Sequence, residues 1–406
     1  MSTVLTDELY RPVIVQKYGG SSVSTPERIK KVAQLIKKSC DAGNRLCVVV
    51  SAMGKTTDQL LATAKEISQN PSRRELDMLL SCGERASMAL LAMALHEEGV
   101  PSISLTGSQS GIITDDVHTG AKIIEVRPHR VRSELDLNKV VIVAGFQGVS
   151  FKKEITTLGR GGSDTTAIAL AAALDAVACE IYSDVAGVYT ADPKVVSQAQ
   201  LLDIVSFEEM ETLASLGAKV LNQDAVSFAK QRGITIFARK TGDTSQETII
   251  KDVNTQNGKP LIAIAHQPCL LRLRVNQIQD LSILLKELSS AGIVPNQLFG
   301  GFERNSDLQS TWCFVALDDA HGIESVLENR PEVQADKDFG TVSLIGKGIL
   351  ASPCLLAEAL EVLKNSKITV EGITSSSQQV SFAIQKNDIL NAVQLLHDGF
   401  FMKGCV

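Results

Sequence analysis

Short runs of apolar residues alternate with longer segments of helical periodicity over the first 250 residues of the chain. The helical segments carry apolar residues three or four positions apart, as at Ile29, Val32 and Ile36, which is the spacing of one helix face. The apolar runs are unbroken, which is typical of strands that helices cover on both sides. This pattern predicts an α/β domain with a mainly parallel sheet, whose strands include residues 13–15, 46–50, 103–105, 140–148, 179–184 and 235–238.

Beyond residue 259 the pattern changes to two shorter cycles of about 70 residues, each in the order strand, helix, strand, strand, helix. Neither cycle contains a convincing group of reactive side chains, so we expect this part to bind or assemble rather than to catalyse. The first cycle is predicted at residues 270–275, 281–290, near 293, 311–317 and 319–327, and the second at residues 342–345, 353–363, 368–370, 380–384 and 389–396.

Composition and charge narrow the class of protein. A chain of 406 residues, 44% hydrophobic and 21% charged, has room for two or three globular domains. The net charge of -6 argues against nucleic acid or an anionic membrane as the main partner, because both select basic surfaces.

The cysteines and the first residues of the chain indicate the cellular compartment of the protein. The eight cysteines show no Cys-x-x-Cys spacing and mostly lie in apolar runs, so we expect reduced core residues rather than disulfides or zinc ligands. The first eleven residues are polar and acidic, unlike a signal peptide, and no apolar run approaches about 18 residues. We therefore expect a soluble, cytoplasmic protein.

A glycine-rich loop at residues 156–167 carries the most informative chemistry, because it leads directly into an alanine-rich segment that is predicted to be a buried helix. The N-terminus of a helix presents N–H groups and a positive dipole, and Gly162 allows close approach of an anion. Arg160 can bind a carboxylate or phosphate through two parallel hydrogen bonds. A plain glycine turn, with Ser163 or Asp164 capping the helix, is the alternative.

A second glycine loop follows the first predicted strand. That strand runs into Gln16 and Lys17, Gly19 and Gly20 follow, and Thr25-Pro26 belongs to a helix-capping sequence. Strand, glycine loop and helix in this order can hold phosphates on loop N–H groups, with Lys17 placed to neutralise them. The sequence is not a Walker A motif. The alternative is a surface lysine before a turn.

Two further groups lie near the predicted strand ends. Thr57 belongs to a hydroxyl-rich segment after the strand at 46–50, where open α/β sheets bind ligands. Glu84 and Arg85 interrupt a long apolar helix predicted over residues 78–95, so neither is expected to be an ordinary solvent-exposed residue. The residues alone leave open whether Glu84 pairs with Arg85 or binds the amine of a ligand.

Taken together, five motifs closely resemble those of the aspartokinases, which have an amino-acid-kinase domain followed by two ACT domains. The motifs occur in the family order, and the resemblance covers roughly the whole chain, more loosely after residue 250. They are Lys-Tyr-Gly-Gly-Ser-Ser-Val at 17–23, Gly-Glu-Arg at 83–85, Thr-Leu-Gly-Arg-Gly-Gly-Ser-Asp-Thr-Thr-Ala at 157–167, Ser-Asp-Val-Ala-Gly-Val-Tyr-Thr-Ala-Asp-Pro at 183–193 and Gly-Ala-Lys-Val-Leu at 217–221.

The resemblance implies an αβα sandwich with a mainly parallel sheet at residues 1–250, followed by ferredoxin-like α+β ACT domains at 265–335 and 336–406. It implies ATP-dependent phosphorylation of L-aspartate to 4-phospho-L-aspartate, the first step toward lysine, threonine and methionine. Mg²⁺ is expected between the phosphates of ATP, and no protein ligand is assigned to it.

The resemblance also implies roles for individual residues. Lys17 would neutralise the phosphates in the transition state, and Asp164 would hold Lys17 in place. Arg160 would bind the α-carboxylate of aspartate and Glu84 its ammonium group. Substrate binding is implied for Thr57, Glu84, Arg160 and Ser163, and nucleotide binding for Lys17, Tyr18, Gly19, Gly20, Gly162, Ser183, Asp184, Tyr189, Lys194, Lys219 and Val220.

The chain departs from the family pattern at several positions. Asn222-Gln223 replaces the usual His-Pro, a change that we expect to be peripheral to the chemistry. The turns that open the ACT helices, which receive the amino-acid effector in the family, lack the usual glycine at Gln279-Asp280 and at Cys354. We still expect feedback by an amino acid such as lysine or threonine. The alternative is that these modules only hold an oligomer together, and we expect a homodimer or larger assembly.

Two rival functions remain at this stage. One is another amino-acid kinase, acting on glutamate, acetylglutamate, carbamate or a nucleotide. The other is a catalytically silent amino-acid sensor. Glu84 paired with Arg160 favours an α-amino acid as substrate, and the ACT modules favour aspartate. The presence of Lys17, Arg160 and Asp164 argues against a silent sensor.

Overall fold

The computed structural model describes residues 11–159, 161–218, 220–253, 260–275, 278–291, 293–301, 310–317 and 323–402. The chain divides into two units. The first comprises residues 1–188, 201–211 and 220–253, and the second comprises residues 189–200, 212–219 and 254–406. The division is therefore discontinuous along the sequence.

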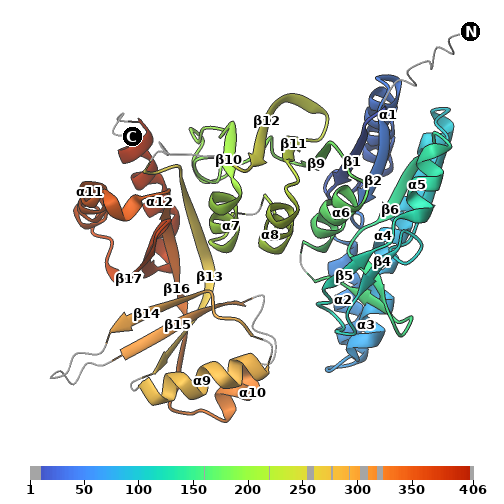
Figure 1. The fold of residues 1–406 in the computed structure, drawn as a ribbon. Helices are drawn as coiled ribbons and strands as arrows, with labels where there is room; N and C mark the ends of the chain where they lie inside the picture. The colour runs from blue at the N-terminus through green and yellow to red at the C-terminus, as the bar shows by residue number, and fades with distance from the viewer. Residues whose placement is uncertain are drawn as a thin grey trace, which may run out of the picture. The chain divides into compact units, whose positions relative to one another are not determined.

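The first unit is built on an eight-stranded sheet (Figure 1). Neighbouring strands are parallel throughout except for the pair β11 and β12, which confirms the predicted, mainly parallel sheet. In spatial order its strands are β10 (Ile204–Ser206), β12 (Asp243–Lys251), β11 (Ile236–Lys240), β9 (Ala178–Ser183), β1 (Val13–Tyr18), β2 (Arg45–Val50), β6 (Val140–Ala144) and β3 (Ser102–Leu105).

Helices cover both faces of this sheet, as the unbroken apolar strands require. On one face α1 and α4 contribute Ile36 and Leu91 to a core that also contains Val48 of β2. The other face carries α5 and α6. The helices of this part of the chain are α1 (Pro26–Asp41), α2 (Thr56–Ile67), α3 (Arg73–Leu80), α4 (Cys82–Glu97), α5 (His129–Asp136), α6 (Gly162–Ala173), α7 (Phe207–Ser215) and α8 (Gln223–Arg232).

A second, four-stranded sheet was not expected from the sequence. Its order is β5 (Ile123–Val126), β4 (Ile112–Thr114), β7 (Gln147–Ser150) and β8 (Ile155–Thr157). The strand predicted over 140–148 therefore ends early, and its last residues start β7. The reason is a turn at Gly145, where a Cβ would lie 2.7 Å from the hydroxyl of Ser163, followed by Phe146 with φ of 67°.

The helix predicted over residues 78–95 is divided into α3 and α4 by a turn at Ser81. Together they form a stretch of 25 residues, Arg73–Glu97, that is long and apolar enough to cross a membrane by length and composition. A core helix passes the same test, and half of its most apolar window is buried within the chain. It also contains the buried carboxylates Asp77 and Glu84.

The second unit contains a six-stranded antiparallel sheet and confirms the predicted repeat of strand, helix, strand, strand, helix. The sheet order is β14-β15-β13-β16-β18-β17, so the long first strands of the two copies, β13 and β16, pair in the middle. The first copy is β13 (Ala263–Val275), α9 (Ile278–Ser290), β14 (Gln297–Gly301), β15 (Ser310–Ala316) and α10 (Ile323–Glu328), and the second is β16 (Gln334–Ile345), α11 (Pro353–Asn365), β17 (Val370–Ser376), β18 (Gln379–Gln385) and α12 (Ile389–His397).

The segment 189–200 packs into the core of the second copy, although it precedes that copy by more than 130 residues in the sequence. Its residues Ala191 and Val196 share a buried cluster with Leu344 of β16 and Phe382 of β18. The main-chain N–H of Ile264 also donates to the carbonyl of Thr190 at 2.7 Å. This segment is thus structurally part of the second unit.

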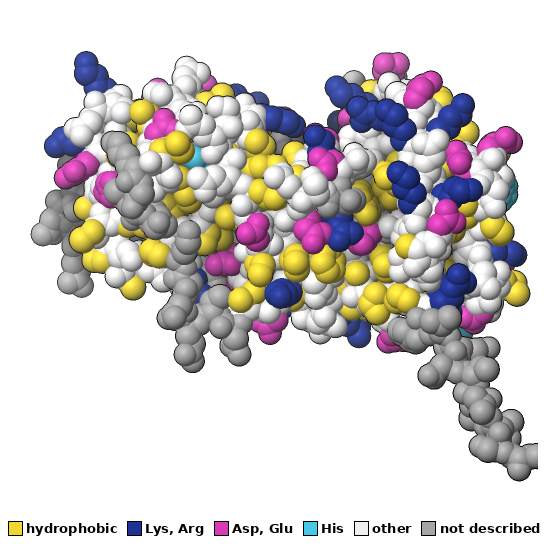
Figure 2. Space-filling model, turned by 90° about the horizontal axis from the view of Figure 1, so that it is seen from above, with side chains coloured by type: hydrophobic (Ala, Val, Ile, Leu, Met, Phe, Trp, Pro, Cys, Tyr) yellow, Lys and Arg dark blue, Asp and Glu magenta, His cyan; other side chains and the backbone are white. Residues whose placement is uncertain are grey.

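Charge is mixed on the face of the protein that Figure 2 presents. Figure 2 shows Lys and Arg side chains interspersed with Asp and Glu over the face that it presents. That face therefore does not carry the continuous basic surface that nucleic-acid backbones select.

Candidate active site

The candidate site lies in the first unit, at the carboxyl ends of the parallel strands. Lys17 and Tyr18 end β1, and Ser183 ends β9 beside them. Gly145 follows the end of β6, and its N–H donates to the carbonyl of Val50 at the end of β2. Open α/β sheets bind ligands at this edge. The topology thus brings together loops that are more than 100 residues apart in the sequence.

Lys17 and Asp164 form an ion pair with a Nζ to Oδ1 distance of 2.6 Å. Their side chains are 11% and 10% exposed, so both are largely withdrawn from water but still reach the surface of the site. Asp164 lies in the first turn of α6. A carboxylate at this end of a helix is stabilised by the helix dipole, and here it fixes the ammonium group at the end of β1.

The loop after β1 is held tightly against its neighbours. The N–H of Gly19 donates to the carbonyl of Tyr182 at 3.1 Å, and the N–H of Gly54 donates to the carbonyl of Gly20 at 3.0 Å. A Cβ on Gly20 would lie 2.8 Å from the carbonyl oxygen of Ala52, and one on Gly19 would lie 3.6 Å from Lys17 Nζ. Glycine is therefore required at position 20, and Gly19 keeps the space beside the ammonium group of Lys17 open.

The loop before α6 needs glycine for a different reason. Gly161 has φ of 70°, and a Cβ there would lie 2.1 Å from the Cβ of Asn222. Gly162 and Ser163 begin α6 and are buried. Asn222, which was expected to be peripheral, lies directly against this loop. Its side chain also accepts from the N–H groups of Asp224 and Ala225 and caps α8, a pattern that its sequence position before that helix could have indicated.

Glu84 is a buried carboxylate with an unused oxygen. It is 3% exposed, and its Oε1 accepts from the N–H of Ala52 at 3.1 Å. Its Oε2 has no hydrogen-bond donor among the described residues, since Arg85 donates instead to Gln147 at 3.1 Å. Burial raises the pKa of Glu84 to about 7, partly offset by the hydrogen bonds from its own N–H and that of Ala52. An ammonium group placed at Oε2 would satisfy this oxygen.

The remaining candidate residues are placed as follows. Thr57 is the second residue of α2 and is partly buried, and Ser163 contacts Gly145. Among the nucleotide candidates, Ser183, Asp184 and Val220 belong to the first unit, whereas Tyr189 and Lys194 belong to the second. Arg160 and Lys219 lie outside the described residues.

Comparison with known proteins identifies the family of this chain. Residues 12–239 match the Amino acid kinase family, and residues 342–400 match an ACT domain. An aspartokinase of Geobacillus stearothermophilus is 41% identical over 395 residues, which cover 96% of this chain and 97% of that protein. The chain belongs to the aspartokinases. The resemblance of its motifs, the fold class and its activity as an aspartate kinase are thereby confirmed.

Solved aspartokinases have the same fold. A crystal structure of E. coli aspartokinase III with aspartate and ADP (R-state) matches 96% of this chain and 100% of that chain, with a TM-score of 0.83 and 25% identity. The same enzyme with lysine and aspartate (T-state) matches 96% of this chain and 99% of that chain, with a TM-score of 0.74 and 26% identity.

Proposed function

We propose that this aspartokinase transfers the γ-phosphoryl group of ATP to the side-chain carboxylate of L-aspartate at the site formed by Lys17, Asp164 and Glu84. The product is 4-phospho-L-aspartate, and ADP leaves. The observation that carries the assignment is the Lys17 to Asp164 ion pair of 2.6 Å beside the two glycine loops. It places a fixed positive charge where the strand ends and the N-terminus of α6 converge.

The reaction needs positioning and charge stabilisation more than proton transfer. The side-chain carboxylate of aspartate is ionised at neutral pH, so no general base has to activate it. An oxygen of this carboxylate attacks the γ-phosphorus as the bond to ADP breaks, and charge spreads over the phosphoryl oxygens. Lys17 neutralises that charge, and Asp164 holds Lys17 in position.

Substrate recognition follows from the buried groups around this centre. Glu84 binds the substrate ammonium group through its unused Oε2, and Arg160 binds the α-carboxylate. Thr57 and Ser163 supply further hydrogen bonds. The nucleotide contacts Gly19, Gly20 and Gly162 through the main chain, and the remaining nucleotide residues are Tyr18, Ser183, Asp184, Tyr189, Lys194, Lys219 and Val220.

Magnesium fits this site as a companion of ATP. Among the described residues no three His, Cys, Asp or Glu side chains come together to hold a metal ion. Mg²⁺ is commonly held by substrate phosphates and water with few protein ligands. We propose that Mg²⁺ would bind together with ATP, where it would neutralise part of the charge of the phosphates.

The physiological role that we propose is the first step toward lysine, threonine and methionine in the cytoplasm, in a homodimer or larger assembly. Feedback by an amino acid through the ACT portion is part of this proposal. E. coli aspartokinase III has been solved in complex with lysine, which makes lysine the first effector to test, followed by threonine.

A hydrogen bond within the second unit links helix α12 to the segment that carries Tyr189 and Lys194, and we propose that feedback acts through it. Thr190 follows Tyr189 in the sequence, and its hydroxyl lies 2.9 Å from Nε2 of the buried His397 on α12. The same hydroxyl accepts from the N–H of Gln200 at 2.9 Å. Since Tyr189 and Lys194 belong to this segment, a shift of α12 would move two proposed nucleotide contacts.

Replacement of Thr190 by valine tests that link. The variant loses both hydrogen bonds of the hydroxyl, and we expect the KM for ATP to rise about three- to tenfold while the KM for aspartate stays within about twofold. Steady-state kinetics with each substrate varied in turn provide the measurement. Ser290→Ala, which removes an exposed hydroxyl of α9, is the control. An unchanged KM for ATP in the valine variant would contradict this proposal.

The pH dependence of aspartate binding is a second consequence of the structure. Because the pKa of Glu84 is raised to about 7, this carboxyl becomes protonated and neutral as the pH falls below about 7. It then no longer attracts the substrate ammonium group, so kcat/KM for aspartate should fall by up to about tenfold per pH unit below that value. A profile at saturating ATP that stays flat between about pH 6 and 8 would contradict this role of Glu84.

A substrate panel tests the assignment as a whole. Purified protein is incubated with ATP, Mg²⁺ and either L-aspartate, L-glutamate, N-acetyl-L-glutamate or carbamate, and acyl phosphate is trapped with hydroxylamine. Product from aspartate alone supports the proposal. Product only from another acid would favour a different amino-acid kinase, and no product from any acid would favour an amino-acid sensor. Lysine and threonine are added in parallel to measure feedback.

A further inference from the structure

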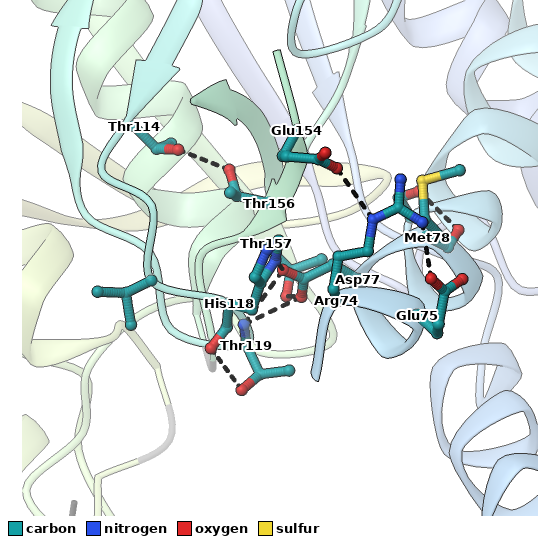
Figure 3. Close-up of polar contacts among 12 residues, drawn as sticks. Arg74, Glu75, Asp77, Met78, Thr114, His118, Thr119, Glu154, Thr156 and Thr157 are labelled. Carbon is teal, nitrogen blue, oxygen red and sulfur yellow. Dashed lines mark hydrogen bonds and ion pairs between the residues drawn. The ribbon is translucent and has the colours of Figure 1, made fainter. Parts of the chain in front are cut away.

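A second buried carboxylate lies near the candidate site and takes no part in the mechanism above. Asp77 is on α3 and is 0% exposed. Its oxygens accept from the main-chain N–H of Thr119 at 3.0 and 3.2 Å and from the hydroxyl of Thr157 at 2.5 Å. Nδ1 of His118 lies 2.6 Å from its Oδ2. Figure 3 shows His118, Thr119 and Thr157 converging on this one side chain.

Removal of the Asp77 carboxylate would destabilise the protein, because the buried groups that donate to it would be left without an acceptor. The donors come from two segments that are far from α3 in the sequence, residues 118–119 and β8. Asp77 therefore cross-links three parts of the first unit. Among the described residues, the nearby Arg74 on the same helix forms ion pairs at the surface with Glu75 and Glu154.

Thr119 shows that the cross-link holds a strained backbone. Its φ is 64°, in the left-handed region that a β-branched residue rarely adopts. Such a conformation persists only where several surrounding contacts stabilise it, and it occurs preferentially at functional sites. Here the N–H of Thr119 is held by both carboxylate oxygens of Asp77, while its hydroxyl donates to the carbonyl of His118 at 2.6 Å.

The strained segment lies against the loop that leads to α6. The N–H of Ala121 donates to the carbonyl of Thr157 at 2.9 Å. A Cβ built on Gly159 would lie 3.7 Å from the Cα of Gly120 and 3.8 Å from the carbonyl oxygen of Thr119. Residues 119–120 therefore lie beside Gly159, near the start of the glycine loop.

The other end of the cross-link leads to Glu84. Helix α3 passes through Ser81 into α4, and Glu84 follows Asp77 by seven residues, or about two helical turns. Asp77 thus connects α3, the helix that precedes α4 and Glu84, with the end of β8, which leads into the loop before α6. In the proposed function α4 and this loop bind the ammonium group and the carboxylate of the same substrate molecule.

We propose that Asp77 is a positioning residue for L-aspartate, which sets the separation between Glu84 and the loop before α6 through Thr119 and Thr157. The inference rests on the proposed function for the identity of the substrate. Asp77 itself touches neither substrate nor ATP. Its loss should therefore weaken the binding of aspartate without affecting the nucleotide.

The test is Asp77→Asn, which keeps the shape of the side chain but replaces one acceptor oxygen by a donor that faces other donors. We expect the KM for aspartate to rise about tenfold or more, because small displacements of binding groups have large effects, and the KM for ATP to stay within about twofold. Arg74→Gln is the matched control on the same helix and should leave both values unchanged. Unfolding temperatures establish that each variant is folded.

One further variant keeps the test decisive if Asp77→Asn does not fold, and another tests the strained backbone if it does. Thr157→Val removes one donor at nearly constant volume and should raise the KM for aspartate about three- to tenfold. In the double variant of Asp77→Asn with Thr119→Gly, glycine adopts the positive φ without strain. The KM for aspartate of this double variant should be at least about threefold lower than that of Asp77→Asn alone. A merely structural role of Asp77 would give no such recovery.

Calorimetric binding of L-aspartate to the full-length protein separates this inference from the proposed function, because it does not depend on turnover. Weaker aspartate binding in the folded Asp77→Asn variant, with ATP binding retained, supports the positioning role even if turnover is not observed. Aspartate affinity within about twofold of the unmodified protein, or an equal loss of aspartate and ATP binding, would overturn it.

Discussion

Lys17→Ala is expected to lower kcat for ATP-dependent phosphorylation of aspartate by about 10³-fold or more while the protein remains folded. The ammonium group is the fixed positive charge at the convergence of the strand ends, and its loss leaves the charge on the phosphoryl oxygens without this partner. The variant also leaves Asp164, which is 10% exposed on its side chain, without its cation. Acyl-phosphate formation at saturating substrates is the measurement.

The control for this variant is Lys30→Ala, which replaces an exposed lysine of α1 and changes the net charge by the same amount. It should retain the kcat of the unmodified protein. Thermal unfolding of both variants distinguishes loss of chemistry from loss of structure. A folded Lys17→Ala protein with kcat within about tenfold of the unmodified one would show that the phosphoryl group is not transferred at Lys17.

Glu84→Gln is expected to raise the KM for aspartate by about 10²-fold. The amide keeps an oxygen that can accept from the N–H of Ala52, but it has no charge to offer the substrate ammonium group. Removal of one partner of a buried charge pair costs about 2–5 kcal/mol, and a loss of about 3 kcal/mol corresponds to this change in KM. Kinetics with aspartate varied at saturating ATP provide the measurement.

The same variant has a second expected property. Because glutamine does not titrate, the fall in kcat/KM for aspartate below about pH 7 should disappear. Ser87→Ala, on the next turn of α4, removes a buried hydroxyl that donates to the carbonyl of Gly83 and serves as the control. A Glu84→Gln variant that retains both a normal aspartate KM and the pH dependence would show that the ammonium group binds elsewhere.

Much of the first unit was predictable because local signals and the long-range fold agree there. The apolar strand at β1, the glycine loop and the capping sequence predict strand, loop and helix, and Thr25 does cap α1 by accepting from the N–H of Arg28. The first glycine loop follows β1, and the second leads into the buried helix α6, as expected. The burial of Glu84 also follows from its position among apolar residues.

The small sheet was not predictable because its strands are three or four residues long and show no clear alternation. In β5 both middle residues are exposed, and its partner β4 has only three residues. Such short segments are stabilised by pairing with strands elsewhere rather than by their own pattern. The break at Ser81 between α3 and α4 was missed for a similar reason, since the apolar pattern continues across it.

The parts of the site that escaped prediction depend on contacts between distant segments. In the sequence, Asp77 is one acidic residue of an ordinary helix. Its partners Thr119 and Thr157 are 42 and 80 residues away. The closeness of Asn222 to Gly161 is likewise visible only in three dimensions. Thr190 lies in a kinase motif, yet it pairs with His397, which is 207 residues away.

One isotope measurement tests the central claim most directly. L-Aspartate labelled with ¹⁸O in its side-chain carboxylate is incubated with the protein, ATP and Mg²⁺, and the product is cleaved with hydroxylamine. Attack of hydroxylamine at the carbonyl carbon releases phosphate that retains the oxygen bridging carbon and phosphorus. If the side-chain carboxylate attacks the γ-phosphorus, the released phosphate carries one ¹⁸O from aspartate. Unlabelled phosphate would contradict the account, because water or another group would then be the acceptor.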